Sequence, residues 1–296
     1  MKIKAIKTLM ILLCIAFFSN AMLSCKENKS TKENDNLTQE TTLNETSPGA
    51  VIAEDLYENF TDVDCVFAAN PRVVNDPCAI SEITYREMRE LSYAGFSVFH
   101  DEALMPVYNQ GIPVNIKNTN NPSAPGTRIV SSRPLSPRPV TGISADSGFS
   151  ILYVSKYLMN REVGFGRKLL QIIEEENISY EHTPSGLDDI SIIIRSNQLT
   201  PEKEVRIVSR VKDELHCDDV YFRHGLSMIV IVGEGMRNNT GLAARAATAI
   251  SATGANIEMI NQGSSEVSLV FGVLSENSDQ ILKSLYNEFF ASVAAY

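Results

Sequence analysis

The chain has 296 residues, which is enough for two or three domains, and 44% of them are hydrophobic, as in ordinary globular proteins. Its 36 Asp and Glu residues outnumber 26 Lys and Arg, which gives a formal net charge of −10. No basic patch is available to neutralise phosphates, so we expect no nucleic-acid partner. The five cysteines show no metal-ligand spacing, and no metal site is predicted.

Residues 1–25 have the pattern of an export signal. Three lysines precede an apolar run, Leu9 to Phe18, and small residues follow. The run is shorter than the ~20 residues that a transmembrane helix needs. Cys25 follows Leu-Ser and resembles the lipid-attachment cysteine of bacterial lipoproteins, which predicts a membrane-anchored lipoprotein. If these residues are instead a mis-assigned start or a gene-fusion scar, we expect a cytoplasmic protein.

Residues 26–48 are polar, with Leu37 and Leu43 as their only large apolar residues. Such a segment cannot bury enough surface to offset the entropy lost on ordering, so it is predicted to be a disordered linker.

The next segment, 49–133, has the signals of a small α/β fragment. The predicted elements are a strand over 65–69, helices over 84–95 and 102–110 that each end at a glycine, and a strand over 113–117. Prolines cluster between residues 118 and 139, which indicates a domain boundary.

After residue 140 one order of elements, strand–helix–strand–strand–helix, occurs twice. The first copy has predicted strands at 149–154, 179–182 and 190–195 with helices at 165–176 and 201–215; the second has strands at 228–232, 256–260 and 267–273 with helices at 241–253 and 279–290. This is the order of a ferredoxin-like unit. The sequence therefore predicts an α+β protein with two tandem modules, 140–222 and 226–296, and a homodimer formed through their exposed sheets.

Each copy has a glycine-bearing loop just before its first helix, at 160–166 and at 237–241. Free backbone N–H groups and the helix dipole at such a position favour a carboxylate. Glu181 and Glu258 follow on the next strands, where they could hold an ammonium group. These features predict a site for a free amino acid, although the glycines could instead merely permit tight turns.

Long strings in both copies, YLMNREVGFGR, EHTPSG, GLAARA and NIEMINQGSSEVSLVFGV, resemble the paired regulatory ACT domains of aspartate kinases. The resemblance implies tandem βαββαβ ACT domains that dimerise and bind lysine or threonine as an allosteric effector. The implied effector residues are Met159, Asn160, Gly164, Phe165, Gly166, Tyr180, Glu181 and His182 in the first copy, and Asn239, Thr240, Gly241, Ile257, Glu258 and Met259 in the second.

The segment 49–133 resembles the end of an amino-acid-kinase domain through DLYENFTDVDCVFAANPRVV, YREMRELSYAGFSVFHDEAL and NTNNPSAPGTRIV. The resemblance implies the remnant of an ATP site formed by Thr61, Asp62, Asp64, Phe67, Arg72 and Ser97. Several residues depart from the usual family wording. Cys65 replaces a glycine, Phe67 a tyrosine, Asn70 an aspartate and Ser97 a phosphate-facing lysine.

In this family the glycine-rich phosphate loop and the aspartate pocket lie in the N-terminal half, which we do not recognise in this chain. We therefore predict no catalytic residues and no cofactor held by this chain alone; ATP with Mg would bind only if another, kinase-domain chain completed the site. The expected function is that of a truncated, amino-acid-sensing regulatory form. The alternatives are the C-terminal part of an active aspartate kinase, which makes 4-phospho-L-aspartate from ATP and L-aspartate, and an extracytoplasmic amino-acid-binding lipoprotein.

Overall fold

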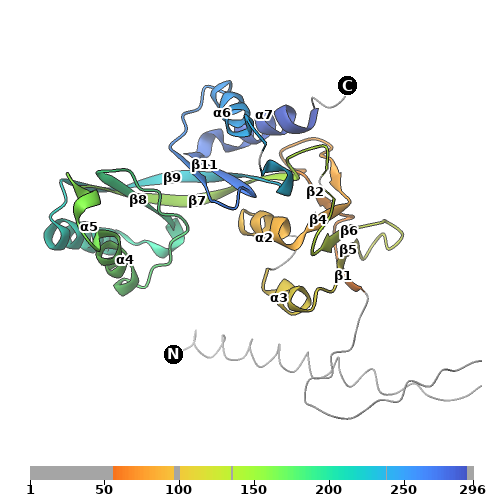
Figure 1. Ribbon diagram of the computed structural model, residues 1–296, viewed down its shortest axis with the longest axis horizontal. Coiled ribbons are helices and arrows are strands. Elements are labelled where there is room, and N and C mark those ends of the chain that lie inside the picture. The colour runs from red at the N-terminus through yellow and green to blue at the C-terminus, as the bar shows by residue number, and fades with distance from the viewer. Residues whose placement is uncertain (1–55, 97–100, 135, 238, 292–296) are drawn as a thin grey trace, which may run out of the picture. The chain divides into compact units, whose positions relative to one another are not determined.

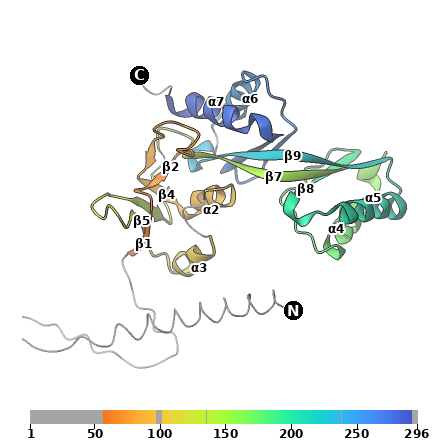
Figure 2. The same ribbon diagram turned by 180° about the vertical axis from the view of Figure 1, so that it is seen from behind.

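The computed structural model describes residues 56–96, 101–134, 136–237 and 239–291, with only the backbone for 101–105 (Figures 1 and 2). The predicted leader with Cys25, the predicted linker 26–48 and Ser97 lie outside these ranges. Within the ranges that are described, no helix combines the length and apolar character that crossing a membrane requires.

The segment before residue 131 forms a four-stranded sheet in the order β1-β5-β6-β4, with a separate two-stranded ribbon, β2 and β3. The strands are β1 (Tyr57–Thr61), β2 (Val66–Phe67), β3 (Ala79–Ile80), β4 (Glu82–Thr84), β5 (Val114–Asn118) and β6 (Thr127–Val130), and the helices are α2 (Tyr85–Tyr93) and α3 (Asp101–Gln110). β1 runs parallel to β5, and β4 runs parallel to β6. The predicted strand at 65–69 is shorter than expected, whereas the two helices and β5 are confirmed.

Helix α2 begins where the sequence provides a capping box. The Thr84 side chain accepts a hydrogen bond from Glu87 N, while the Glu87 carboxylate accepts one from Thr84 N. Met88 and Leu91 are fully buried on one face of the helix, four and seven residues after Thr84. The capping and the apolar face together fix the register of α2 against the core.

The rest of the chain forms one five-stranded antiparallel sheet in the order β10-β11-β9-β7-β8. Its strands are β7 (Gly142–Ser155), β8 (Asp189–Arg195), β9 (Asp219–Val232), β10 (Met259–Gln262) and β11 (Ser268–Leu274). β7 and β9 each have 14 residues and pair from Gly142 opposite Val232 to Ser155 opposite Asp219. Both predicted modules therefore share these two strands.

This sharing shows how the predicted segments 140–222 and 226–296 are joined. Residues 142–147 pair with 227–232, beside β11 and β10, whereas residues 149–155 pair with 219–226, beside β8. Residues 142–147, at the start of the first predicted segment, thus lie in the half of the sheet that contains the strands of the second segment. The periodicity of the sequence locates strands but does not show which strands pair, so this sharing of strands was not predicted.

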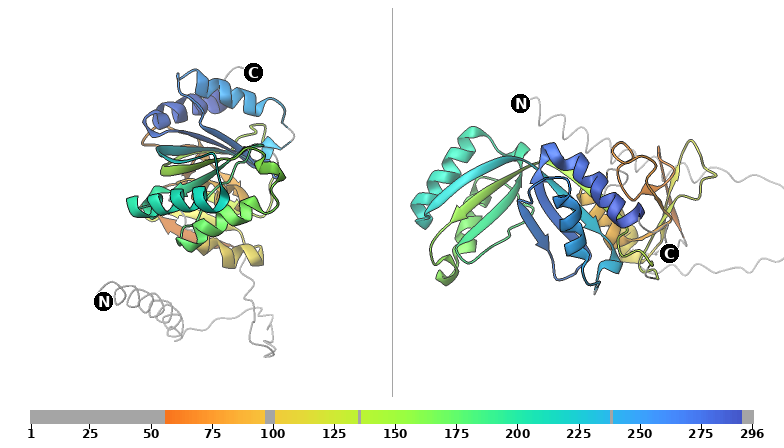
Figure 3. Two further views of the ribbon diagram at one scale, coloured as in Figure 1. Left: turned by 90° about the vertical axis from the view of Figure 1, so that its left-hand side faces the viewer. Right: turned by 90° about the horizontal axis from the view of Figure 1, so that it is seen from above.

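Two pairs of helices pack on this sheet, and Figure 3 shows them on opposite sides of it. They are α4 (Phe165–Glu175) with α5 (Pro201–Leu215), and α6 (Leu242–Ser251) with α7 (Ser278–Phe290). In β8, Ile192 and Ile194 are buried in the α4–α5 core and Ile193 in the other core, as the alternation of side chains along a strand requires. The sheet is therefore buried on both faces at this point.

The predicted helices over 165–290 are confirmed, and α5 has the predicted bounds with Thr200 as its N-cap. The predicted strand 179–182 is not formed as a strand. His182 makes one isolated bridge to Ile193, and Pro184, which has no N–H to donate, follows two residues later. The predicted strand 256–260 lies slightly later, as β10.

A short 3₁₀ turn, Glu234–Met236, connects β9 to the loop before α6. It lies directly against the backbone of Pro139 in the connection that leads into β7. A Cβ atom added to Gly233 would lie 2.2 Å from Pro139 O, and one added to Gly235 would lie 2.8 Å from Pro139 Cα. These two glycines allow the turn and the connection to approach each other this closely.

We predict that Gly233→Ala lowers the free energy of unfolding by ~1–3 kcal/mol, because the added methyl group must displace backbone rather than a flexible side chain. Gly263→Ala is the control, since its Cβ would meet no atom closer than 3.8 Å, and its effect should stay within ~0.5 kcal/mol. Urea unfolding of both variants measures the difference. Equal effects of the two substitutions would contradict the close packing of the turn.

Candidate functional site

A pocket of about 410 Å³ lies at the start of α6. Asn239, Thr240 and Gly241 line it from the loop that precedes the helix, Gln262 lines it from the end of β10, and Glu266 lines it from the connection between β10 and β11. β9 and β10 run in the same direction because each is antiparallel to β11. The loop that leaves β9 and the residues that follow β10 therefore meet at the same edge of the sheet.

The local backbone leaves the N-terminus of α6 open to a ligand. Gly241 occupies the N-cap position with φ of 86°, a left-handed conformation that favours glycine, and no side chain caps the helix. The first N–H groups of a helix have no partner within it. Together with the helix dipole they provide a suitable place for a carboxylate, and Leu242 and Ala243 of this first turn line the pocket.

The structure brings together three of the six residues predicted for this copy, namely Asn239, Thr240 and Gly241. The other three do not line the pocket. The Glu258 carboxylate instead accepts hydrogen bonds from the Arg223 guanidinium and from Asn256 Nδ2, the latter at 3.1 Å. Met259 is buried in the core, and the partly buried Ile257 packs against the same core.

Gln262 and Glu266 were not predicted from the sequence. A signal for them exists, because the polar stretch Gln-Gly-Ser-Ser-Glu follows a strand that returns to the edge from which the helix starts. Using that signal requires knowing that β10 is parallel to β9, which depends on the pairing of both strands with β11.

In the first copy, the loop before α4 is organised around Glu162. Its carboxylate accepts hydrogen bonds from Lys156 Nζ at 2.5 Å and Lys168 Nζ at 2.8 Å. Gly164 caps α4 with φ of 80°, as Gly241 caps α6, and again no side chain caps the helix. Asn160 N donates to Leu187 O at 3.1 Å, which ties the loop to the segment before β8.

The remaining predicted residues of the first copy have different surroundings. Met159 and Phe165 are buried in the α4–α5 core, and no atom lies within 4 Å of a Cβ placed on Gly166. Tyr180 lines an open groove along α4. The Glu181 carboxylate pairs with Arg195 Nε at 3.3 Å, and His182 Nδ1 lies 3.1 Å from Asn261 Nδ2. No hydrogen bond or ion pair of the described residues joins Glu181 or His182 to the loop before α4.

The predicted ATP-site residues are partly grouped. Thr61 Oγ1 donates to Asp62 Oδ1 at 3.2 Å, and Asp64 Oδ1 accepts from Asn118 Nδ2 at 2.7 Å and Asn121 Nδ2 at 3.3 Å. These groups lie at the carboxyl ends of the parallel strands β1 and β5, where α/β sheets commonly bind ligands. Asn118 and Asn121 were not predicted as site residues.

Phe67 lies in the ribbon β2–β3, and Arg72 is exposed, with its backbone N–H donating to Asn70 Oδ1 at 3.0 Å. Among the described residues, no hydrogen bond or ion pair joins either of them to Asp64. Within the same residues, no group of three or more His, Cys, Asp or Glu side chains could hold a metal ion.

Glu162 should titrate far below a typical glutamate. The hydrogen bonds from Lys156 and Lys168 lower its pKa to about 2. The ionised carboxylate therefore stabilises the fold fully above pH ~4.3, which is the pKa of an unfolded glutamate. This contribution is lost as the pH falls through the folded pKa. In an NMR titration we expect the carboxyl midpoint near 2 and a higher midpoint in Lys168→Met; Lys212→Met, an exposed control, should leave it unchanged. A midpoint at the ordinary glutamate value in the wild type would contradict the pairing of Glu162 with Lys156 and Lys168.

His182 provides a second pH-dependent test. Burial lowers its pKa below the ordinary value. The negative charges of Glu181 and Glu90 raise the pKa, but burial outweighs them. The unfolded chain, with a histidine pKa of ~6.5, therefore binds this proton more readily, and stability falls as the pH drops below that value. The free energy of unfolding should decrease more between about pH 7 and 5 in the wild type than in His182→Gln. Identical pH profiles would show that His182 is not buried in this way.

Comparisons with known proteins identify both parts of the chain. Residues 49–118 match the amino acid kinase family, and residues 229–289 match the ACT domain. The chain is 57% identical to aspartokinase 3 of Bacillus subtilis over 249 residues, which cover 83% of this chain and 55% of that protein. It is 30% identical to a bifunctional aspartokinase/homoserine dehydrogenase of Haemophilus influenzae, and the matched region covers 81% of this chain and 30% of that protein.

Solved structures agree with this. Aspartate kinase of Clostridium acetobutylicum superposes with a TM-score of 0.76 and 42% identity, over 79% of this chain and 55% of that one. E. coli aspartokinase III in complex with lysine and aspartate gives a TM-score of 0.66 at 22% identity, over 80% and 52%, and shares the fold. The chain spans about half, or less, of each of these relatives. The predicted α+β fold, an amino-acid-kinase fragment followed by ACT domains, is confirmed, and the chain belongs to the aspartokinase family.

Proposed function

We propose that this chain is an amino-acid-sensing regulatory part of an aspartokinase and that it binds lysine or threonine as an effector. The observation that carries the proposal is the pocket at the start of α6, which places the uncapped N-terminus of a helix beside Gln262 and Glu266. The Clostridium acetobutylicum relative is described as an allosteric enzyme, and lysine is present in a solved structure of E. coli aspartokinase III.

The chemistry of the pocket suits the two charged groups of a free amino acid. The carboxylate would lie at the N–H groups of Leu242 and Ala243, where the helix dipole is positive. The ammonium group would lie beside Glu266, with Gln262 offering an amide oxygen. Asn239 and Thr240 would then contact the effector's side chain, since they are polar residues of the loop that line the pocket.

The loop before α4 is a second candidate place, because Gly164 likewise leaves that helix without a side-chain cap. A homodimer formed through the ACT sheet remains part of the proposal. The outer edge of the sheet at β10 has no strand paired to it among the described residues, and Ile260 on that edge is exposed.

Aspartate kinase activity is the second candidate function. It is favoured by the group of Thr61, Asp62 and Asp64 with Asn118 and Asn121 at the carboxyl ends of β1 and β5. In that case the γ-phosphoryl group of Mg-bound ATP would pass to the side-chain carboxylate of L-aspartate, leaving ADP. A further kinase segment or chain would supply the phosphate loop. The lipoprotein alternative depends on residues outside the described ranges and stays a prediction.

Isothermal titration of the full chain tests the regulatory proposal. We expect heat of binding with lysine or threonine, and an affinity ~10–100-fold lower in Glu266→Gln, because the ammonium group loses its charged partner. Glu276→Gln makes the same change at an exposed position and should bind like the wild type. Absence of heat with both amino acids, or unchanged affinity in Glu266→Gln, would overturn the proposed site.

A further inference from the structure

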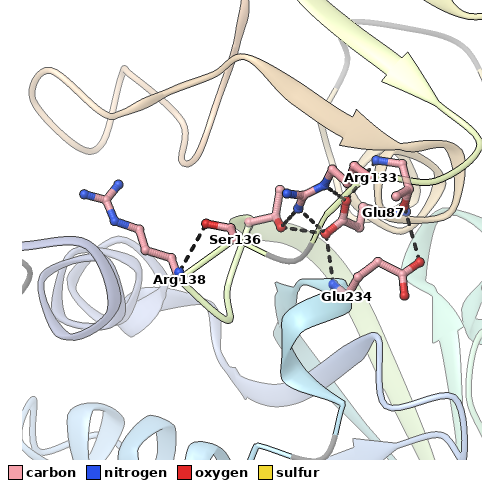
Figure 4. Close-up of polar contacts among 7 residues, drawn as sticks. Glu87, Arg133, Ser136, Arg138 and Glu234 are labelled. Atoms are coloured by element: carbon pink, nitrogen blue, oxygen red, sulfur yellow. Dashed lines mark hydrogen bonds and ion pairs between the residues drawn. The ribbon is translucent and has the colours of Figure 1, made fainter.

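Glu87 is a fully buried carboxylate at the junction of the kinase segment and the ACT fold. Figure 4 shows it surrounded by donors from three parts of the chain. Its oxygens accept hydrogen bonds from Thr84 N at 2.9 Å, Arg133 Nε at 3.1 Å, Arg133 Nη2 at 2.8 Å, Thr141 Oγ1 at 2.6 Å and Glu234 N at 2.9 Å. A single side chain of α2 thus holds its own helix start, the connection into β7 and the turn after β9.

The surroundings keep this carboxylate charged. Burial raises the pKa of Glu87, but the hydrogen bonds from Arg133, Thr141, Thr84 and Glu234 outweigh burial and hold the pKa below its ordinary value. A buried charge is tolerated when its charge and its hydrogen-bonding capacity are both satisfied. Removing a partner is strongly unfavourable, so the geometry of these contacts is rigidly defined.

Glu234 links this cluster to the pocket at α6. It begins the turn Glu234–Met236, and Met236 lines the pocket. Asn239 N donates to Met236 O at 3.0 Å, so the pocket loop continues directly from the turn. The Glu234 carboxylate also accepts a hydrogen bond from Thr84 Oγ1 at 3.4 Å, which gives α2 a second contact with the same turn.

The other side of the turn is fixed as well. Gly233 and Gly235 lie against the backbone of Pro139, in the same connection that carries Arg133 and Thr141. The turn is therefore held between helix α2 and the connection into β7, and both of these are anchored to the Glu87 carboxylate. A shift of the pocket loop cannot be absorbed by the turn alone.

We infer that Glu87 is a positioning residue that couples occupancy of the amino-acid pocket at α6 to helix α2 of the kinase segment. The inference rests on the proposed function and deepens it, since it names the path by which the effector acts. Glu87 does not line the pocket and acts through Glu234 N. Such coupling is reciprocal, so a change at Glu87 must alter the pocket by the same free energy with which the ligand alters α2.

Hydrogen exchange of the full chain tests this inference with or without a ligand. In Glu87→Gln we expect amides of 234–237 and 239–243 to exchange at least ~10-fold faster than in the wild type, since their anchor has lost its charge. The amides of α4 should be unaffected, and Glu276→Gln, an exposed control, should leave both regions unchanged.

Measurements with ligand distinguish coupling through Glu87 from a merely structural role of this residue. In the wild type, saturating lysine or threonine should slow exchange in α2, and this protection should be absent in Glu87→Gln at matched pocket occupancy. If Glu87→Gln does not fold, Arg133→Lys keeps the charge but loses the two-pronged hydrogen bonding of the guanidinium. It should give a smaller increase confined to the same amides.

The outcomes separate this inference from the proposed function. If neither amino acid binds the wild type, the proposed function fails, and exchange of the unliganded chain still decides whether Glu87 positions the loop. Unchanged exchange at 234–243 in every folded variant at Glu87 or Arg133 would overturn the inference. Ligand protection of α2 that persists in Glu87→Gln would overturn it too.

Discussion

The pairing of β7 with β9 along fourteen residues is the constraint on which the rest of the structure depends. A one-residue slip would turn every buried side chain of one strand to the wrong face, so the pairing fixes the register of both ACT halves at once. The register shifts only near Phe149 and Ser147, beside Gly148, whose φ is 90°. Because β9 also pairs with β11, and β11 pairs with β10, the end of β9 and the start of α6 lie at the edge where β10 ends.

Charge has different roles at the surface and at the junction. Arg210 pairs with Glu214 on the exposed face of α5 at 2.7 Å, and such a pair contributes ~0–1 kcal/mol. Glu87 and Arg133 form a pair of similar length, but Glu87 is fully buried and Arg133 is 12% exposed. Breaking such a pair typically costs ~3–5 kcal/mol because a charge is left without compensation. The buried pair can therefore transmit a change between segments, which the surface pair cannot.

Local signals in the sequence predicted local structure well. Thr200 and Pro201 set the start of α5 to the residue, since capping depends only on neighbours in the chain. The loop containing Asn239 to Gly241 was found for the same reason. Glu258 was assigned to the pocket, yet its carboxylate pairs with Arg223 of β9, 35 residues away. That contact, like the sharing of β7, depends on which strands pair, and periodicity does not contain this information.

A crystal structure of the full chain grown with saturating threonine or lysine tests the central claim most directly. The account predicts an amino acid in the pocket at α6, with its carboxylate at the N–H groups of Leu242 and Ala243 and its ammonium group beside Glu266. An empty pocket at saturating concentration, or a ligand bound only elsewhere on the chain, would contradict it.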